Sequence, residues 1–504
     1  MHPTMVPPEM DESDLTADEL PPEVSSSSPV AADRSRRFFE YASVAILFFI
    51  NLINYMDRYT VAGVLDDVIK HYDLKNSEGG LLQTVFVVTY MVAAPVFGFL
   101  GDRYSRKIIM AAGIVFWSAT TLLGSIPPKD FWLFAVLRGL VGIGEASYST
   151  VAPTVIGDLF AGPRRSSMLA FFYFAIPVGS GMGYIVGASV AQMLGAWYWA
   201  LRVTPVLGAV AVLLVLFVLR EPLRGASDGA TAMGPSSIKE DLRALVTNRS
   251  YIWSTLGFTC VTFAAGALSW WAPSYMVHAL TVYGGDASEG RVNRIFGIIT
   301  TVAGIVGVAT GSGLSAHFRP WSVRADALIC SAGLLLSVPL LFLGASLAHV
   351  APIAAWVLMF FGMTAICLNW AIVADILLYI LVPSRRATGA AFQILTSHLL
   401  GDAASPYIVG LVYDAILAGR TDARSHYFSL QYALYLPVAV LVLGSLFFVV
   451  LSWYIVADRT HCALLTQEML KETRALAAPW RALRLHYASA GRMERVVRRK
   501  ERLR

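Results

Sequence analysis

Long runs of apolar residues, separated by short polar segments, extend from about residue 40 to residue 456. Each run is long enough to cross about 30 Å of hydrocarbon as a helix. The pattern predicts twelve spans, at residues 40–65, 79–101, 107–126, 131–160, 168–195, 200–219, 251–281, 293–316, 325–346, 351–382, 387–416 and 428–456. We therefore expect an all-α membrane protein, and an even number of spans places both termini on the same side.

The polar segments divide the spans into two sets of six. The longest internal break, residues 220–250, separates an N-terminal bundle (38–219) from a C-terminal bundle (251–456). Loops after even-numbered spans carry most of the basic residues, namely Arg103, Arg106, Lys107, Arg164, Arg165, Arg319, Arg324, Arg385 and Arg386. Because cytosolic loops are rich in Lys and Arg, we predict that both termini and the linker are cytosolic.

The ends of the chain differ from the spans in composition. Residues 1–37 are acidic and rich in Pro and Ser, without the apolar segment of a cleavable signal peptide, so we expect a disordered arm. Residues 457–504 hold twelve Lys or Arg against five acids. This tail is predicted to be a basic amphipathic helix at anionic headgroups, with a solvated tail as the alternative.

The two halves also repeat in sequence. PRRSSMLAFFYFAIPVGSGMGYIVG (Pro163–Gly187) is similar to SRRATGAAFQILTSHLLGDAASPYIVG (Ser384–Gly410). In both segments an Arg-Arg pair opens a span that contains Tyr-Ile-Val-Gly. Repeated halves are typical of transporters that carry a substrate site on the axis between two rocking bundles.

Composition supports this class and excludes others. Only 14% of the 504 residues are charged and 56% are hydrophobic, whereas about 25% of residues are charged in soluble domains. The four cysteines show no disulfide or metal-ligand spacing, and no Walker motif or convincing nucleophile-base pair is present. We therefore expect no enzyme activity, no cofactor, no metal and no nucleic-acid partner, and a monomer among membrane lipids.

Two charges interrupt the fourth span, LRGLVGIGEASYSTVAP (Leu137–Pro153). Arg138 and Glu145 are seven residues apart, so they fall on one face of the helix. Charged groups in a membrane are costly unless they face a bundle interior or a water-filled cavity, where they usually serve function. The alternative is a buried pair that only holds helices together.

The loop between the second and third spans, GFLGDRYSRK (Gly98–Lys107), is a second candidate. A carboxylate among basic residues at the membrane surface can form a bonded cluster in one conformation and release it in another. We predict such a conformational latch from Gly98, Asp102, Arg103, Arg106 and Lys107. Basic cytosolic residues around a tight turn are the simpler alternative.

This loop resembles the signature of the major facilitator superfamily, and Arg138-x3-Gly142-x-Gly144 resembles the fourth-span signature of its proton-coupled members. Longer segments resemble the spinster family within it, namely NYMDRYTVAGVL (Asn54–Leu65), GEASYSTVAPT (Gly144–Thr154), FYFAIPVGSGMGY (Phe172–Tyr184), NWAIVADILLY (Asn369–Tyr379) and SHLLGDAASPY (Ser397–Tyr407). The resemblance implies twelve transmembrane helices in two pseudo-symmetric six-helix bundles. It also implies transport of lysophospholipid or sphingosine-1-phosphate.

A rise of about 1.5 Å per residue places Asp57, Arg58 and Arg138 at one level, with Glu145 nearer the midplane. A carboxylate that loses its arginine partner in a closed, dry cavity would take a proton. Family resemblance assigns the same coupling role to Asp57, Arg58 and Glu145. A static salt-bridge cluster is the alternative.

The C-terminal half offers further candidates. His398 and Asp402, four residues apart, could exchange protons as a pair. We predict that the lipid contacts Arg58, Arg138, Glu145, Tyr148, Trp270, Trp271, Met363, Asn369 and His398, with Tyr275 and Phe361 also along the tail path; the aromatic residues could instead be helix packing. Relatives carry an acid after the glycine of the tenth span, whereas this chain has Gly362-Met363-Thr364, which weakens a coupling role there.

These observations lead to one function and three alternatives. We expect proton-linked movement of a lysophospholipid (lysophosphatidylcholine or lysophosphatidylethanolamine) from the lysosomal lumen to the cytosol by alternating access. The alternatives are export of sphingosine-1-phosphate at the plasma membrane, transport of a small hydrophilic solute, and lipid binding by a receptor without net transport.

Overall fold

The computed structural model describes residues 29–160, 162–222, 238–382 and 385–501. Within these ranges all regular secondary structure is helical. The elements are α1 (Pro29–Thr60), η1 (Ala62–Val64), α2 (Leu65–Tyr72), α3 (Asn76–Arg103), α4 (Arg106–Gly124), α5 (Phe131–Leu159), α6 (Gly162–Leu194), η2 (Trp197–Arg202), α7 (Val203–Phe217), α8 (Ile238–Thr247), α9 (Arg249–Tyr283), α10 (Glu289–Phe318), α11 (Ala325–Leu347), α12 (Pro352–Cys367), α13 (Asn369–Ile380), α14 (Arg386–Leu400), α15 (Ala404–Leu417) and α16 (Ala423–Glu501).

These helices form the predicted all-α membrane protein. In the described ranges, ten helical stretches are long and apolar enough to cross a membrane. Two predicted spans are absent from these ten. One is α5, which contains Arg138, Glu145 and several small polar residues, and the other is the eleventh span, which is divided into α14 and α15 around Gly401. The structure is therefore consistent with twelve spans.

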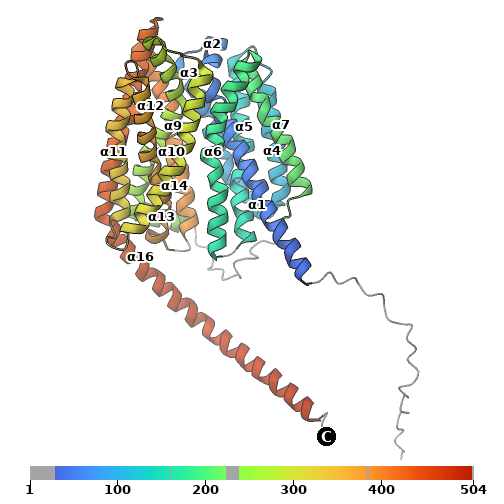
Figure 1. The fold of residues 1–504 in the computed structure, drawn as a ribbon. Helices are drawn as coiled ribbons and strands as arrows, with labels where there is room; N and C mark the ends of the chain where they lie inside the picture. The colour runs from blue at the N-terminus through green and yellow to red at the C-terminus, as the bar shows by residue number, and fades with distance from the viewer. Residues whose placement is uncertain (1–28, 161, 223–237, 383–384, 502–504) are drawn as a thin grey trace, which may run out of the picture.

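The helices form two groups that lie side by side. Figure 1 shows α1 and α4 to α7 on the right, and α9 to α16 on the left. The bundle has a terminal end, where α1 begins and α16 leaves, and an opposite end, the α2 end, where α2 lies (Figure 1). Helix α1 begins at Pro29, inside the segment predicted to be a disordered arm; residues 1–28 lie outside the described ranges.

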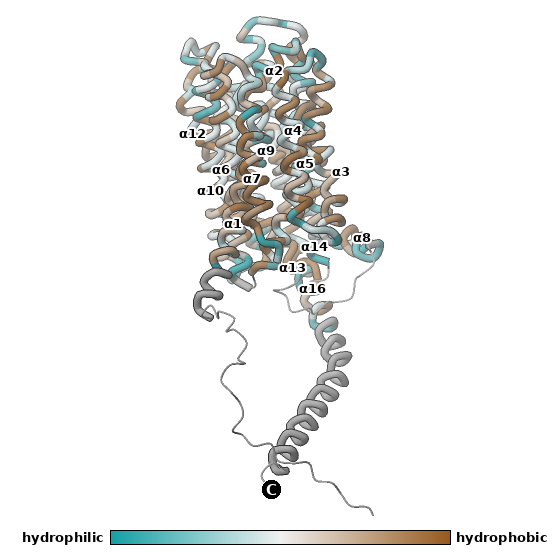
Figure 2. Tube along the Cα trace, turned by 90° about the vertical axis from the view of Figure 1, so that its right-hand side faces the viewer, coloured by the Kyte–Doolittle hydropathy of each residue, from teal (hydrophilic) through white to brown (hydrophobic). Residues whose placement is uncertain are grey.

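The outer surface of the bundle is apolar. Side chains such as Ile353, Phe217 and Val92 are 81%, 79% and 70% exposed. Figure 2 shows hydrophobic residues along the length of the helices and hydrophilic residues gathered at the α2 end and around α8. A hydrophobic band between polar ends is the distribution that a bilayer requires.

Two helix pairs join the halves, α3 with α15 and α6 with α10. Close approach of α6 and α10 depends on Gly181 and Gly297, because a Cβ on either glycine would collide with the backbone oxygen of the other. Polar contacts between the halves gather toward the α2 end. They include Lys70–Glu289 (3.0 Å), Ser274–Asp66 (2.6 Å), Trp270–Gly79 (3.2 Å), Asn293–Gly63 (3.2 Å), Thr84–Ala403 (2.5 Å) and Thr301–Pro177 (3.1 Å). The structure is therefore closed at the α2 end.

Candidate functional site

A buried charge cluster lies between α1 and α5. Arg138 of α5 reaches α1 with both terminal nitrogens: Nη1 lies 3.2 Å from Oδ2 of Asp57, and Nη2 donates to the backbone oxygen of Arg58 at 2.9 Å. The other carboxylate oxygen of Asp57 accepts from the hydroxyl of Thr204 on α7 at 2.5 Å. Asp57 is 1% exposed and Arg138 is 4% exposed. This first pair is thus fixed by several hydrogen bonds.

The second pair in the cluster is held more loosely. Nη2 of Arg58 lies 3.6 Å from Oε2 of Glu145. Glu145 is fully buried, and neither of its carboxylate oxygens has a hydrogen-bond partner among the described residues. A bare charge in such a place is costly, and one opposite charge at 3.6 Å compensates it only in part. Of the two acids in the cluster, Glu145 is therefore the one with fewer bonding partners.

Aromatic rings line the cluster. The guanidinium carbons of Arg58 and Arg138 lie 4.8 and 4.5 Å from the ring centroid of Phe86 on α3, and Arg58 also lies over Tyr55 and Tyr90. Such contacts stabilise a cation without adding a negative charge. The rings therefore add to the stabilisation that each arginine receives from its own acid.

Small residues of α5 bring the helices close enough for these contacts. A Cβ on Gly142 would collide with the backbone oxygen of Phe86, and Thr89 of α3 donates to the backbone oxygen of Gly139 at 2.7 Å. Tyr148, a predicted lipid contact, is fully buried and donates to the backbone oxygen of Leu47. In this conformation Tyr148 packs helices together.

The His398–Asp402 pair exists, but it is separate from the charge cluster. Nδ1 of His398 lies 2.9 Å from Oδ1 of Asp402, at the break between α14 and α15. No hydrogen bond or ion pair in the described ranges joins this pair to the cluster. Asn369, at the break between α12 and α13, is fully buried; its amide nitrogen donates to Ile366, and its amide oxygen has no partner among described residues.

The predicted tail-path residues are mostly buried. The indole nitrogens of Trp270 and Trp271 donate to the backbone oxygens of Gly79 (3.2 Å) and Pro406 (2.9 Å), and both rings are 1% exposed. Met363 and Tyr275 are also buried, whereas Phe361 is 53% exposed. In this conformation the two tryptophans contribute to helix packing, and Trp270 joins the halves at their closed end.

The predicted latch residues lie at the terminal end. Arg106 opens α4 and forms an ion pair with Asp158 near the end of α5, and its backbone N–H donates to Glu221 at 2.9 Å. Arg103 lies over the ring of Phe99, Lys107 is half-buried, and Gly98 has open space beside it. The side chain of Asp102 lies outside what the structure describes. Among the predicted residues whose side chains the structure describes, Arg106 bonds α4 to α5.

The structure shows a matching cluster in the C-terminal half that we did not predict. Nε of Arg319, after α10, lies 2.9 Å from Asp326 of α11, and Nη2 lies 2.9 Å from Asp375 of α13. Asp326 also accepts from Ser315 (2.6 Å) and Tyr379 (2.9 Å). In each half, an arginine between the second and third spans thus binds an acid of the fourth. In the sequence, Asp375 is a charged residue within an apolar span, and this feature could have indicated the cluster.

A second cluster that we did not predict closes the α2 end. The carboxylate of Asp414 on α15 accepts from the backbone N–H groups of Asn76 (3.0 Å) and Ser77 (2.8 Å) at the start of α3, and from the Asn76 amide. A carboxylate at a helix N-terminus satisfies unpaired N–H groups and interacts favourably with the helix dipole.

No group of His, Cys, Asp and Glu placed to hold a metal occurs in the described ranges.

Comparisons with known proteins agree with this architecture. The family model of the Major Facilitator Superfamily matches residues 47–406. The chain is 50% identical to protein spinster homolog 1 of Homo sapiens over 441 residues (85% of this chain and 84% of that protein). It is 54% identical to protein spinster of Drosophila melanogaster over 380 residues (75% and 62%).

Solved structures show the same fold. A bacterial homolog of the human lysosomal transporter Spinster, inward-facing and unoccupied, matches with a TM-score of 0.74 at 19% identity, over 84% of this chain and 98% of that chain. The D-xylose-proton symporter matches with a TM-score of 0.64 at 15% identity, over 81% and 97%.

Proposed function

Because the chain belongs to the spinster family of the major facilitator superfamily and is thus a multi-pass membrane transporter, we propose that it moves a single-chain lysophospholipid by proton-linked alternating access. The proposed direction is from the lysosomal lumen to the cytosol, with the terminal end on the cytosolic side. One observation carries this proposal: Glu145 is fully buried, faces one arginine at 3.6 Å, and accepts no hydrogen bond from described residues.

In the proposed cycle the two pairs of the cluster act differently. Asp57 and Arg138 hold α1, α5 and α7 together through fixed hydrogen bonds. Glu145 and Arg58 form the exchangeable pair: while Glu145 is charged, Arg58 is attracted to it; when Glu145 takes a proton, Arg58 is released to bind the lipid phosphate. Binding of a proton and of the anionic headgroup would thus be linked at one arginine.

The lysosomal address and the lysolipid substrate rest on similarity. The solved bacterial neighbour is a homolog of a lysosomal transporter, and half of the 441 aligned residues are identical to human spinster homolog 1. The basic loop residues at the terminal end support a cytosolic terminal end. His398 and Asp402, which are bonded to each other at the break in the eleventh span, are proposed as a second proton-coupling pair.

The test uses purified protein in liposomes loaded with lysophosphatidylcholine or with sphingosine-1-phosphate, with and without a pH gradient. We expect efflux of lysophosphatidylcholine that the gradient accelerates, and loss of that efflux in both Glu145→Gln and Asp57→Asn. Efflux that is unchanged in both variants would rule out the proton switch. Preference for sphingosine-1-phosphate would instead identify an exporter of that lipid, and binding without efflux would identify a receptor.

A further inference from the structure

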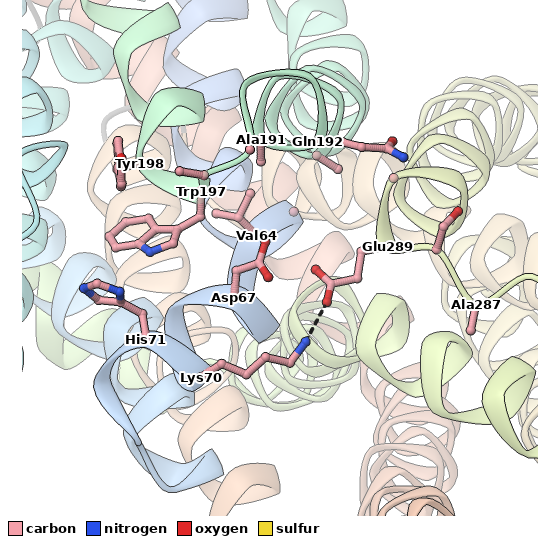
Figure 3. Close-up of a pocket in the computed structure, with 16 residues that line it drawn as sticks. Val64, Asp67, Lys70, His71, Ala191, Gln192, Trp197, Tyr198, Ala287 and Glu289 are labelled. Carbon is pink, nitrogen blue, oxygen red and sulfur yellow. Dashed lines mark hydrogen bonds and ion pairs between the residues drawn. The ribbon is translucent and has the colours of Figure 1, made fainter.

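A cavity of about 750 Å³ lies between the halves at the α2 end, away from the charge cluster. It is bordered by the junction of α1 and α2, by the end of α6 with the turn that follows, and by the start of α10. Figure 3 shows Asp67 and Glu289 on facing walls, with Lys70 bonded to Glu289. Its volume is within the range of small-molecule sites, about 300–1,000 Å³.

The sequence repeat relates the cavity beside α6 and α10 to the Asp414 contact between α15 and α3. Aligning the two Tyr-Ile-Val-Gly segments, which begin at Tyr184 and Tyr407, places Ala191 of α6 at the position of Asp414 in α15. Asp414 fills the space at the start of α3. Ala191 has no side chain long enough to do the same at the start of α10, and it lines the cavity. At Ala191 the cavity thus takes the place of the Asp414 contact, and the neighbouring Gln192 lies against Gly290 at the start of α10.

The charges on the cavity wall are unbalanced. Asp67 and Glu289 are acidic, Lys70 is basic, and Lys70 is bound to Glu289 at 3.0 Å. Asp67 makes no hydrogen bond or ion pair with another described residue, so the lining has one uncompensated negative charge. A concave surface with excess charge of one sign concentrates ligands of the opposite sign.

The wall also holds an unused hydrogen-bond donor. Trp197 is 5% exposed and lines the cavity, and its indole nitrogen is buried without a partner among the described residues. A buried donor without an acceptor is costly, and a ligand oxygen would satisfy it. The cavity thus offers a carboxylate for a cation, and one of its lining residues carries an unsatisfied N–H group.

From this geometry we propose that the α2-end cavity binds the ammonium group of a zwitterionic lysolipid headgroup, with Asp67 as the main contact, before the lipid reaches the charge cluster. This inference rests on the proposed function. Gly63 and Val64 of η1 line the cavity, and Arg58, near the end of α1, lies five residues before Gly63 in the chain. The headgroup would therefore pass along α1, from the cavity to the arginine that binds phosphate.

The first test measures the cavity without requiring transport. Cysteine introduced at Ala287, on the cavity wall, is reacted with cationic and anionic methanethiosulfonates, with the unsubstituted protein as the background and a free thiol as the reference. We expect the introduced cysteine to react about fivefold faster with the cationic reagent than with the anionic one, relative to the free thiol. This ratio of rates should fall several-fold in Asp67→Asn. It should persist in the matched control Asp73→Asn, because Asp73 is an exposed acid outside the cavity. No preference, or none that depends on Asp67, overturns the inference.

Soluble probes then identify the cation. Choline chloride and ethanolamine hydrochloride should each slow the labelling of the Ala287→Cys variant, and Asp67→Asn should remove this protection. Protection by choline alone indicates a quaternary ammonium headgroup, and protection by ethanolamine alone indicates a primary one. Absence of protection by both contradicts the proposed site.

Transport separates this inference from the proposed function. In liposomes, Asp67→Asn should raise the half-saturating lysolipid concentration several-fold for entry from the α2 end and leave the maximal rate unchanged. Wild-type protein without any transport would refute the proposed function, while the labelling result would still decide the cation site. Transport with the same half-saturation in wild type and Asp67→Asn would refute the cavity as a headgroup site.

Discussion

Asp414 and Asn76 join the two halves of the transporter through a helix cap: a carboxylate oxygen of Asp414 on α15 accepts from the first backbone N–H of α3 at 3.0 Å. The second oxygen accepts from Ser77 at 2.8 Å. The contact crosses the interface that must open for access from the α2 end. Its loss therefore changes a conformational equilibrium in addition to local stability.

We predict that Asp414→Ala shifts the protein toward conformations open at the α2 end. Hydrogen bonds to a charged group contribute about 1.5–3 kcal/mol, so the population ratio should change by about tenfold or more. Spin labels at Lys75 and Arg420, which are both exposed, would report the change as longer distances between α3 and the end of α15.

The matched control is Asp422→Ala. Asp422 caps α16 of its own half through Ser425 (2.9 Å), and hydrogen bonds from Ser425 hold the pKa of Asp422 below its usual value. It is thus a charged cap that does not cross the interface. Equal distance changes in both variants, or no change in Asp414→Ala, would contradict a gating role.

Glu145→Gln should separate lipid movement from proton movement. The substitution preserves side-chain volume but removes the group that takes the proton. We expect net efflux driven by a pH gradient to be lost, while exchange of labelled for unlabelled lysolipid at equal pH continues. Measurement of both modes on one liposome preparation checks this prediction, and loss of exchange as well would indicate damage to lipid binding.

Arg138→Gln should destabilise the fold more than Glu145→Gln. Removing Arg138 leaves Asp57, which is 1% exposed, with only Thr204 as a side-chain partner. Breaking a buried pair in this way costs about 3–5 kcal/mol. Thermal unfolding in lipid nanodiscs should show a lower midpoint for Arg138→Gln, with part of the loss recovered in the double variant Asp57→Asn/Arg138→Gln. Additive losses would mean that the two residues do not form a coupled pair.

Arg319→Gln should slow transport without preventing folding. The variant loses the ion pairs from Arg319 to Asp326 and Asp375, which join α10, α11 and α13. Asp326 keeps its hydrogen bonds from Ser315 and Tyr379, so it is not left without partners. Transport rates and unfolding midpoints should be compared with Arg324→Gln, an exposed arginine near the same loop, which we expect to behave as wild type.

The transmembrane architecture could be predicted because apolar segments long enough to span a bilayer have few alternatives to a helix. The relative depths of Asp57, Arg58, Arg138 and Glu145 along their helices could also be estimated from the sequence, since the rise per residue is fixed. Which arginine binds which acid did not follow. That pairing depends on how α1 and α5 are rotated against each other, and glycine contacts such as Gly142 with Phe86 set that rotation.

The polar contacts at the two ends of the bundle were harder to predict. Asp414 and Asn76 are 338 residues apart, and Arg319 and Asp375 are 56 apart. Asp375 alone stands out as a charge within an apolar span, but its partner and the pairing of Asp414 with Asn76 appear only in the folded chain. Trp270 and Trp271 illustrate the opposite case: their sequence suggested a path for lipid, whereas the closed α2 end uses both rings as packing.

The residues of the charge cluster and the rings that line it come from α1, α3, α5 and α7, so none of these contacts crosses the interface between the two halves. The first 222 residues therefore carry the whole of this ionic assembly. Co-expression of residues 1–222 with residues 238–504 as two separate polypeptides should therefore reproduce the charge cluster. The first polypeptide should still exchange protons when its association with the second leaves the cluster accessible to water.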